Sequence, residues 1–212
     1  MKGINKRYCL NRSEYGTHMI LGKCIGRNNK VLDIGCNVGY LKRVSDATNS
    51  FWGVDLNRNL LKTAKEINGY RGVYLSDLNQ NIPKIKNKFD VLVFADILEH
   101  LINPEIVLRS FIKRNLKEDG KVLISLPNIA NISIRIKLLF GSFNYSENGI
   151  LDRGHFHLYT EKTACEMVVN ANLSINRIYY SSNKMGWFLD RFGFFGNLLG
   201  YNLILVCQKQ KS

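Results

Sequence analysis

The chain has 212 residues, of which 45% are hydrophobic, and this is enough for one domain with a sizeable core. Its five cysteines are scattered without a Cys-x-x-Cys pair, which argues against a disulfide framework or a zinc knuckle and favours reduced thiols. The net charge of +13 would suit a nucleic acid or an anionic membrane surface as partner. However, the basic residues are spread along the chain, so a solvated basic surface is the favoured interpretation.

The N-terminus and the absence of long apolar runs bear on where the protein resides. Residues 1–7 include the basic residues Lys2, Lys6 and Arg7, but no apolar segment follows them, and no uncharged apolar run is long enough to span a membrane. We therefore expect a cytoplasmic protein without a transmembrane segment. Since no repeat, low-complexity tract or linker divides the chain, residues 1–212 are expected to form a single domain.

The first two thirds of the chain alternate between predicted helices and short apolar strands. Residues 13–26 have the pattern of a capped helix, with Ser13 and Glu14 ahead of its apolar positions, so residues 1–26 are expected to form an N-terminal helical lid. Strands are predicted at 31–34, 51–55, 72–75, 89–94 and 121–126, with helices near 58–68 and at 104–116. Apolar strands between helices indicate a parallel sheet covered on both faces.

The pattern changes after residue 127. A helix is predicted around 129–140, then a turn-rich stretch over 141–153, a helix over 161–171, and strands at 175–180 and 203–207. Between these last strands, residues 183–200 form an aromatic segment, either helix or loop, whose apolar side would cover the core, a second copy in a homodimer, or weakly a membrane surface. The whole pattern predicts an α/β, doubly wound, Rossmann-like sheet of seven mostly parallel strands with an antiparallel C-terminal strand.

A glycine-bounded turn over residues 33–39 follows the first predicted strand. Such a turn lets the backbone approach a ligand that sits against the next helix N-terminus. Gly35 lies 20 residues before Asp55, which ends the second strand, where a carboxylate can bind both hydroxyls of a ribose. Asn37 and Tyr40 stand where the glycines of a G-x-G-x-x-G motif would fall, so the turn does not match a nicotinamide-dinucleotide site.

With Asp55, Ser76-Asp77 and residues 89–104, this turn resembles the successive motifs of class I S-adenosylmethionine-dependent methyltransferases, over about residues 28–180. The resemblance implies S-adenosylmethionine as cofactor and S-adenosylhomocysteine as product. It places Asp33 and Gly35 at the methionine end, Asp55 at the ribose and Asp77 at the adenine amino group. The full implied set is Asp33, Gly35, Cys36, Asn37, Gly39, Asp55, Leu56, Asp77, Leu78, Ala95 and Asp96.

Asn37 departs from the family pattern, because the usual loop has glycine at that position. Asparagine is one of the few other residues that tolerate a left-handed backbone. We therefore expect the turn to survive at Asn37, with less room beside the cofactor.

Methyl transfer is an in-line displacement that needs a positioned, dry site and, for a hydroxyl acceptor, removal of a proton. His100 follows the fourth strand and His155 lies in the turn-rich stretch, so we expect both to converge there as catalytic residues. His18, in the first helix, is expected to be structural. Residues 128–160 form the predicted acceptor-side insertion; they resemble methyltransferases of sugar and surface-glycan biosynthesis, whereas Asp96-x-x-Glu99-His100 also occurs in those of quinone biosynthesis. The favoured prediction is O-methylation of a sugar, a glycan precursor or a small metabolite.

Two alternatives stay open. Asp96, Glu99, His100 and His155 match a motif of small-RNA 3′-terminal 2′-O-methyltransferases, in which the equivalent residues hold a divalent metal. Glu-His after the fourth strand is also common in methyltransferases without metal, and the chain shows no appended RNA-binding module. Metal and nucleic acid are therefore the less favoured predictions. The third interpretation is a non-catalytic scaffold that binds a partner through residues 187–199.

Overall fold

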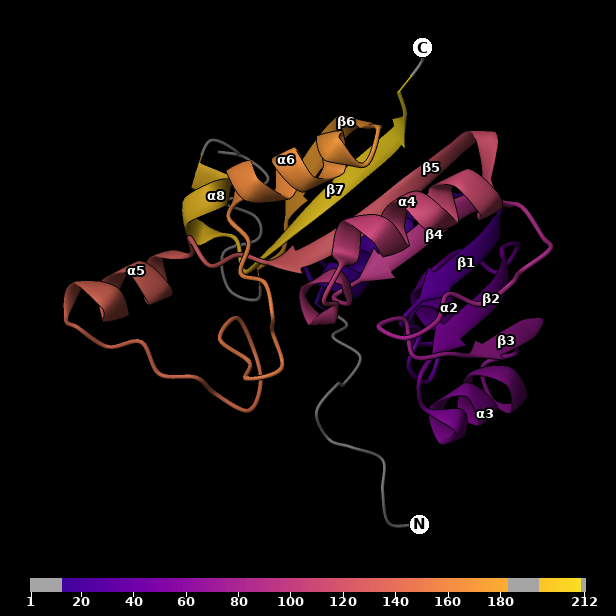
Figure 1. Ribbon diagram of the computed structural model, residues 1–212, viewed down its shortest axis with the longest axis horizontal. Helices are drawn as coiled ribbons and strands as arrows, with labels where there is room; N and C mark the ends of the chain where they lie inside the picture. Colours follow the sequence, from indigo (N-terminus) through magenta and orange to yellow (C-terminus); the bar gives the residue numbers. More distant parts are fainter. Residues whose placement is uncertain (1–12, 183–194, 211–212) are drawn as a thin grey trace.

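A computed structural model describes residues 13–182 and 195–210, which form a seven-stranded sheet in the order β3-β2-β1-β4-β5-β7-β6 (Figure 1). Strands β1 to β5 pair in parallel, and β7 is antiparallel to both of its neighbours. The predicted doubly wound sheet and its antiparallel C-terminal strand are confirmed. The strands are β1 (Lys30–Ile34), β2 (Ser50–Asp55), β3 (Gly72–Leu75), β4 (Phe89–Ala95), β5 (Leu116–Pro127), β6 (Leu173–Tyr180) and β7 (Asn202–Lys209).

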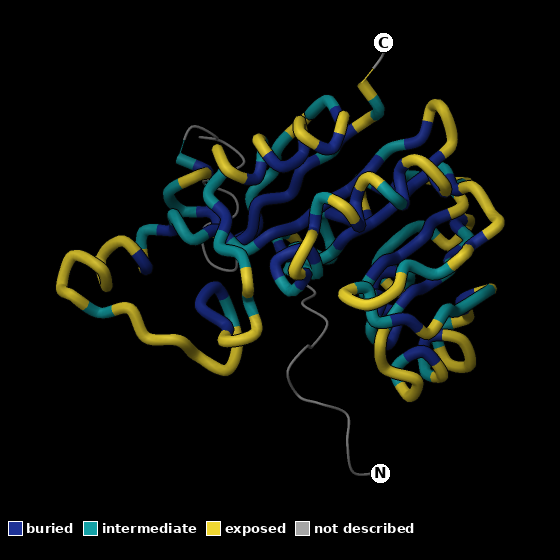
Figure 2. The backbone as a smooth tube through the Cα atoms, in the orientation of Figure 1, coloured by how far each residue is buried: buried dark blue, intermediate teal, exposed yellow. Residues whose placement is uncertain are grey.

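The central strands are buried on both faces, as their continuous apolar runs predict. In β4, Leu92 and Phe94 belong to one core, whereas Val91 and Val93 belong to the other. Because successive side chains of a strand point to opposite faces, each face needs its own cover. Helices α4 (Pro104–Asn115) and α6 (Glu161–Asn170) cover the first core, and α1 (Thr17–Ile25), α2 (Tyr40–Val44) and α3 (Arg58–Glu66) cover the second. Figure 2 shows the strands as a buried layer beneath partly exposed helices.

The N-terminal helix is shorter than predicted, and its predicted cap is wrong. Helix α1 begins at Thr17, with Gly16 in the cap position and no side-chain cap. The Gly16 N–H donates to the Ser13 carbonyl at 2.8 Å, so Ser13 and Glu14 belong to a turn before the helix. The first part of the predicted lid, residues 1–12, lies outside the described residues.

The segment after β5 extends away from the sheet. Helix α5 (Ile132–Leu139) starts later than predicted because the Asn131 side chain accepts the Ser133 N–H and caps the helix there. The helix projects to the side of the sheet in Figure 1. The chain then returns through turns, and an isolated bridge between Asn128 and Tyr159 joins the two ends of the excursion.

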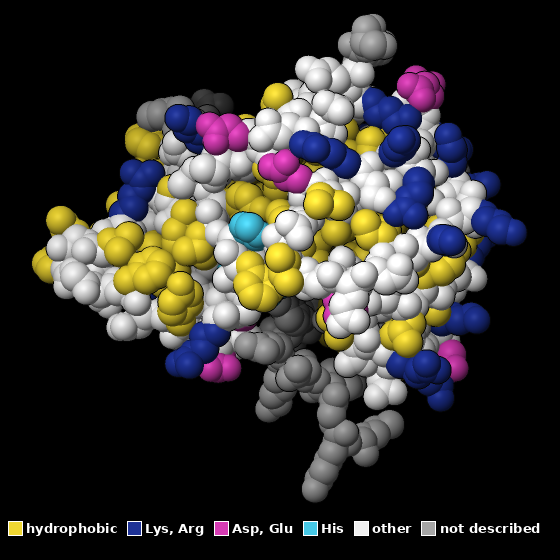
Figure 3. All heavy atoms as spheres, viewed as in Figure 1, with side chains coloured by type: hydrophobic (Ala, Val, Ile, Leu, Met, Phe, Trp, Pro, Cys, Tyr) yellow, Lys and Arg dark blue, Asp and Glu magenta, His cyan; other side chains and the backbone are white. Residues whose placement is uncertain are grey.

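Most of the predicted aromatic segment, residues 183–194, lies outside the described residues. Its end contains the short helix α8 (Gly196–Leu199). Over residues 13–182 and 195–210, no helix combines the length and apolar character that crossing a membrane requires. In Figure 3, lysine and arginine side chains lie mostly around the rim of the visible face, and hydrophobic side chains occupy its centre.

Candidate active site

The loop between β1 and α2 forms the tight turn that the sequence predicts. Its backbone enters the left-handed region at Gly35 (φ 81°), Asn37 (φ 50°) and Gly39 (φ 84°). The prediction that Asn37 sustains the turn is therefore confirmed. A Cβ atom on Gly35 would lie 2.9 Å from the Ile97 side chain, so glycine is required there for packing as well as for conformation.

Asp55, at the end of β2, anchors this loop. Its Oδ2 accepts the Asn37 N–H at 2.9 Å, and its Oδ1 accepts the Asn57 N–H at 2.9 Å. Burial raises the pKa of Asp55, and the backbone hydrogen bonds act in the opposite direction. Each carboxylate oxygen can accept a second hydrogen bond, so Asp55 retains capacity for ribose hydroxyls. The anchoring role is additional to the role inferred from the sequence.

Asp33 and Cys36 turn their side chains inward, beneath the loop. Asp33 is 3% exposed, and its carboxylate accepts a hydrogen bond from the Tyr70 hydroxyl at 2.7 Å. Burial raises the pKa of Asp33 to about 7 and raises the pKa of the Cys36 thiol well above its usual value. The Asp33 carboxylate thus supports the loop from below, and its partner Tyr70 was not predicted.

The residues expected around the adenine lie at the same edge of the sheet. The Ser76 N–H donates to the Asp55 carbonyl at 3.0 Å, which brings the end of β3 next to the end of β2. Asp77 accepts the Asn79 N–H at 3.0 Å, and Leu78 packs partly against the core. Leu56, by contrast, is 69% exposed, so this edge offers both a carboxylate and apolar side chains.

Asp96, after β4, links three strands through its side chain. Its Oδ1 accepts hydrogen bonds from Ser125 Oγ and Asn202 Nδ2, both at 2.7 Å. Of the four residues that the sequence offered as metal-ligand candidates, Glu99, His100 and His155 have possible ligand atoms within 4.8 Å of one another, and Asp96 is not part of that group. The two partners of Asp96, Ser125 and Asn202, are polar residues within apolar strands, and this is the sequence signal that could have indicated them.

His18 and Tyr40 lie closer to the site than the sequence suggested. Their rings meet edge to face, with centroids 6.1 Å apart. Burial lowers the pKa of His18, and the nearby charge of Asp96 opposes that effect. Helix α1 thus brings an imidazole near the end of β4, although this histidine was expected to be only structural.

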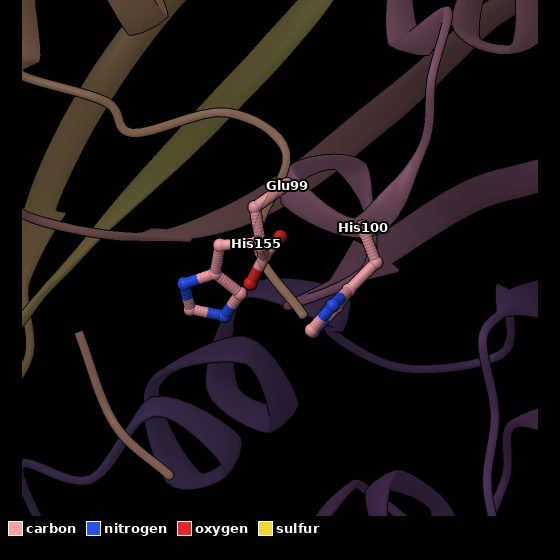
Figure 4. Close-up of side chains that lie close together, drawn as sticks. All are labelled: Glu99, His100 and His155. Carbon is pink, nitrogen blue, oxygen red and sulfur yellow. The ribbon is translucent and has the colours of Figure 1, made fainter. Parts of the chain in front are cut away.

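His100 and His155 converge, as predicted. His100 lies in the short 3₁₀ helix η1 (Leu98–His100) after β4, and its ring centroid is 4.7 Å from that of His155. Glu99, 1% exposed, points into the same space from η1 (Figure 4). One potential ligand atom from each of these three residues lies within 4.8 Å of the others.

Backbone hydrogen bonds hold the His155 loop against η1. The N–H groups of Phe156 and His157 both donate to the Glu99 carbonyl, at 2.8 and 3.2 Å. The Gly154 N–H donates to Asp152 Oδ1 at 2.7 Å. These contacts explain why two segments far apart in the sequence meet here.

Hydrogen bonds to backbone carbonyls favour one tautomer of each imidazole. His100 Nδ1 lies 2.9 Å from the Gly154 carbonyl, and His155 Nδ1 lies 3.1 Å from the Ile150 carbonyl. Since a carbonyl oxygen only accepts, each Nδ1 carries hydrogen and each Nε2 keeps a lone pair when the ring is neutral. Burial, with the neighbouring His100, lowers the pKa of His155. The lowered pKa favours the neutral form of His155, whose Nε2 can accept a proton.

Comparisons with known proteins identify relatives of this chain. A family model described as a methyltransferase domain matches residues 6–178. The chain is 34% identical over 108 residues to ubiquinone biosynthesis O-methyltransferases of Glaesserella parasuis serovar 5 and Actinobacillus pleuropneumoniae serotype 5b. These alignments cover 47% of this chain and 45% and 46% of the two relatives. The chain thus spans about half the length of the curated relatives it matches.

Solved structures share the fold at low sequence identity. An S-adenosylmethionine-dependent methyltransferase from Clostridium acetobutylicum aligns with a TM-score of 0.63 at 15% identity, covering 95% of this chain and 93% of that one. A Thermotoga maritima protein described as a possible histamine N-methyltransferase aligns with a TM-score of 0.68 at 14% identity, covering 94% and 90%. At these identities the likeness concerns the fold alone.

Proposed function

This chain belongs to the methyltransferase-domain family, and from that premise we propose that it transfers the methyl group of S-adenosylmethionine to a hydroxyl group of a small metabolite. The observation that carries the hydroxyl acceptor is the neutral His155, whose Nε2 faces the space shared with His100 and Glu99. An amine with a free lone pair needs no such base, whereas a hydroxyl must lose its proton as it is methylated.

The loop side of the site fits the cofactor. The Asp55 carboxylate has acceptor capacity for a ribose diol, and the left-handed turn at residues 35–39 exposes backbone toward the methionine end. Leu56 and Leu78 offer apolar contacts for the adenine ring. S-adenosylmethionine, when bound, supplies an electrophilic methyl group on its sulfonium. The protein's part is to hold that group in line with the acceptor oxygen and to exclude water.

Ile97 connects the cofactor loop with the histidine cluster. Its side chain packs on Gly35 of the cofactor loop, and the chain continues from Ile97 into η1 with Glu99 and His100. The histidine cluster is therefore adjacent to the loop expected to bind the methyl donor. An acceptor hydroxyl at the cluster loses its proton to His155 Nε2 as the methyl group is transferred.

The class of acceptor is supported by the names of the curated relatives, which are ubiquinone biosynthesis O-methyltransferases. The sugar or glycan acceptor is a prediction from the sequence of residues 128–160. Both kinds of acceptor are small hydroxylated molecules. We propose that the acceptor is a phenol or a sugar hydroxyl. The experiment must distinguish this acceptor from the alternative, the 3′ end of an RNA.

The experiment supplies methyl-labelled S-adenosylmethionine with a panel of catechols, sugars, nucleotide-linked sugars and short RNAs. Label transferred to a catechol or sugar oxygen, with S-adenosylhomocysteine formed in equal amount, is the expected result. Transfer only to a nitrogen or carbon atom, or only to RNA 3′ ends, would contradict the proposed acceptor class. If the protein does not bind S-adenosylmethionine, both enzyme interpretations fail and the non-catalytic scaffold is the interpretation that stays.

A further inference from the structure

A cavity lies between the start of α4, helix α6 and the segment that leads into α6. Its volume is about 410 Å³, which is within the range of ligand pockets in proteins. Its walls come from residues 102–106, 157–159 and 163–170, and α4 and α6 lie on the same face of the sheet (Figure 1). None of the lining residues belongs to the set expected to bind the cofactor or to carry the chemistry, so the cavity offers room for a further ligand.

The charged side chains of this cavity are acidic. Glu105 and Glu166 line it, and no lysine or arginine is found among the described residues of its walls, although the chain carries a net charge of +13. Each carboxylate has one partner on its own helix, with Arg109 at 3.2 Å from Glu105 and Lys162 at 4.0 Å from Glu166. Such exposed pairs contribute little, and a carboxylate accepts several hydrogen bonds, so both glutamates can also bind a cationic ligand.

Tyr159 adds a buried hydroxyl to the cavity wall. The residue is 6% exposed, and its hydroxyl has no hydrogen-bond partner among the residues that the structure describes. Burial raises the pKa of Tyr159, and the charges of Glu99 and Glu105 raise it further, so the hydroxyl stays protonated in a region of negative potential. Most buried polar side chains in proteins are hydrogen-bonded. A ligand in the cavity can supply the partner that Tyr159 lacks.

The rest of the wall is largely apolar or aromatic. Ile102 and Ile106 are exposed, Met167 is buried, and the rings of His157 and Tyr159 lie 6.1 Å apart at an angle of 35°. On the face seen in Figure 3, acidic side chains lie beside the hydrophobic centre, while lysine and arginine lie mostly at the rim. This combination suits a ligand with an apolar body and a positive charge.

We propose that this cavity binds a small organic cation, an ammonium group attached to an apolar or aromatic body. The Glu105 and Glu166 carboxylates and the Tyr159 hydroxyl are the acceptors available to its N–H groups, and Ile102 and Ile106 are the apolar surface available to its body. An anion would be repelled by the same carboxylates. The inference does not rest on the proposed function, because the ligand is distinct from both the cofactor and the hydroxyl acceptor.

The test uses the full chain without cofactor and three probes that share a phenyl body: 2-phenylethylammonium, 2-phenylethanol and 3-phenylpropionate. Binding is followed by NMR, through shifts of backbone N–H signals during titration. Because each exposed charge pair contributes roughly 2–5-fold in affinity, we expect the ammonium probe to bind about 10-fold more tightly than the alcohol. Its saturable shifts should lie at residues 102–106, 157–159 and 163–170, and the carboxylate probe should not bind there.

Glu105→Gln and Glu166→Gln keep the size of each side chain and remove its charge. Each should weaken binding of the ammonium probe roughly 2–5-fold, and the double variant about 10-fold. The matched control is Glu118→Gln, which also removes one carboxylate. Glu118 is exposed and pairs with Lys209 outside the cavity, so we expect wild-type affinity.

Tyr159→Phe removes the unpartnered hydroxyl and keeps the ring. It should weaken binding of the ammonium probe by roughly 2–10-fold, the effect of one lost hydrogen bond. Thermal unfolding should show no loss of stability, because the hydroxyl has no partner in the described part of the protein.

Three outcomes would overturn the cation site: equal affinity for the ammonium and the alcohol, shifts confined to other residues, or an affinity that the double glutamate variant leaves unchanged. Saturating S-adenosylhomocysteine should leave the affinity for the ammonium probe unchanged. Displacement of the probe would place it in the cofactor or acceptor site and would also overturn the inference. Absence of S-adenosylmethionine binding would contradict the proposed function and leave this site in place, so the two proposals can fail separately.

Discussion

The cofactor loop and the histidine cluster are built in different ways. The loop is held by contacts between neighbouring parallel strands, such as the hydrogen bond from Asn37 to Asp55. The cluster depends on a loop that returns from beyond β5 and docks through the Glu99 carbonyl, with His100 bound to the carbonyl of Gly154. The cofactor loop is therefore part of the sheet framework, whereas the histidine cluster depends on the segment that leaves the sheet after β5. Substitutions in the loop and in the cluster should therefore have different effects.

The largest expected effect is the pH dependence of stability that comes from Asp33, the buried residue beneath the cofactor loop. Burial raises the pKa of Asp33 to about 7, above the usual value near 4. The folded state therefore holds this proton more tightly than the unfolded chain, and the resulting stability is full below about pH 4 and lost as the pH rises through about 7. Because each pKa unit corresponds to about 1.4 kcal/mol, the loss is on the order of 4 kcal/mol.

Asp33→Asn removes this titration while keeping an acceptor for Tyr70. We expect the stability of the variant relative to wild type to increase between about pH 4 and pH 7, measured by urea unfolding without cofactor. Parallel profiles for the two proteins would show that Asp33 does not titrate in this range.

Asp55→Ala removes both the anchor of the loop and the proposed ribose ligand. S-adenosylmethionine affinity should fall by at least about 100-fold, equivalent to about 2.7 kcal/mol. Calorimetry measures it, with Glu66→Ala on the surface of α3 as a control that keeps wild-type affinity. An unchanged dissociation constant in Asp55→Ala would place the ribose elsewhere.

His155→Asn tests the histidine cluster, as Asp55→Ala tests the cofactor loop. We expect kcat to fall by about 100-fold, the lower end of what a positioned acid or base contributes, while S-adenosylmethionine affinity stays at the wild-type value. If the variant loses cofactor affinity as well, the two regions are not separable. If it turns over at the wild-type rate, His155 has no part in the chemistry.

The smallest effect is expected at Asn37. Asn37→Ala places a less tolerant residue at φ 50° and removes the acceptor for the Val38 N–H, so stability should fall by about 1–2 kcal/mol. Asn37→Gly, the matched variant, keeps the conformation accessible and should change stability by less than about 1 kcal/mol. Thermal unfolding distinguishes them, and equal losses would mean that the backbone conformation is not what Asn37 provides.

The strands and the cofactor loop were predictable because their signals are local. The apolar runs of β1 and β4 and the distance from Gly35 to Asp55 are read directly along the chain, and the fold confirms the sheet that they imply. The partners of buried polar groups were not predictable in this way. Tyr70 beneath Asp33 and Asn202 beside Asp96 come from distant segments.

The histidine cluster was predicted only in part. Its convergence followed from the position of each histidine at the same edge of the sheet. The histidine tautomers depend on the carbonyls of Gly154 and Ile150, which no pattern in the sequence indicates. Nor does any pattern indicate that the buried Glu99 carboxylate has no hydrogen-bond partner among the described residues. The exclusion of Asp96 from the cluster likewise required its hydrogen bonds to Ser125 and Asn202.

The proposed cofactor site is tested by calorimetric titration of the wild-type chain with S-adenosylmethionine and with S-adenosylhomocysteine. We predict saturable one-to-one binding of both, because the Asp55 anchor and the left-handed turn at Asn37 are in place. Absence of binding by both molecules, in protein shown to be folded, would contradict the proposed methyltransferase function.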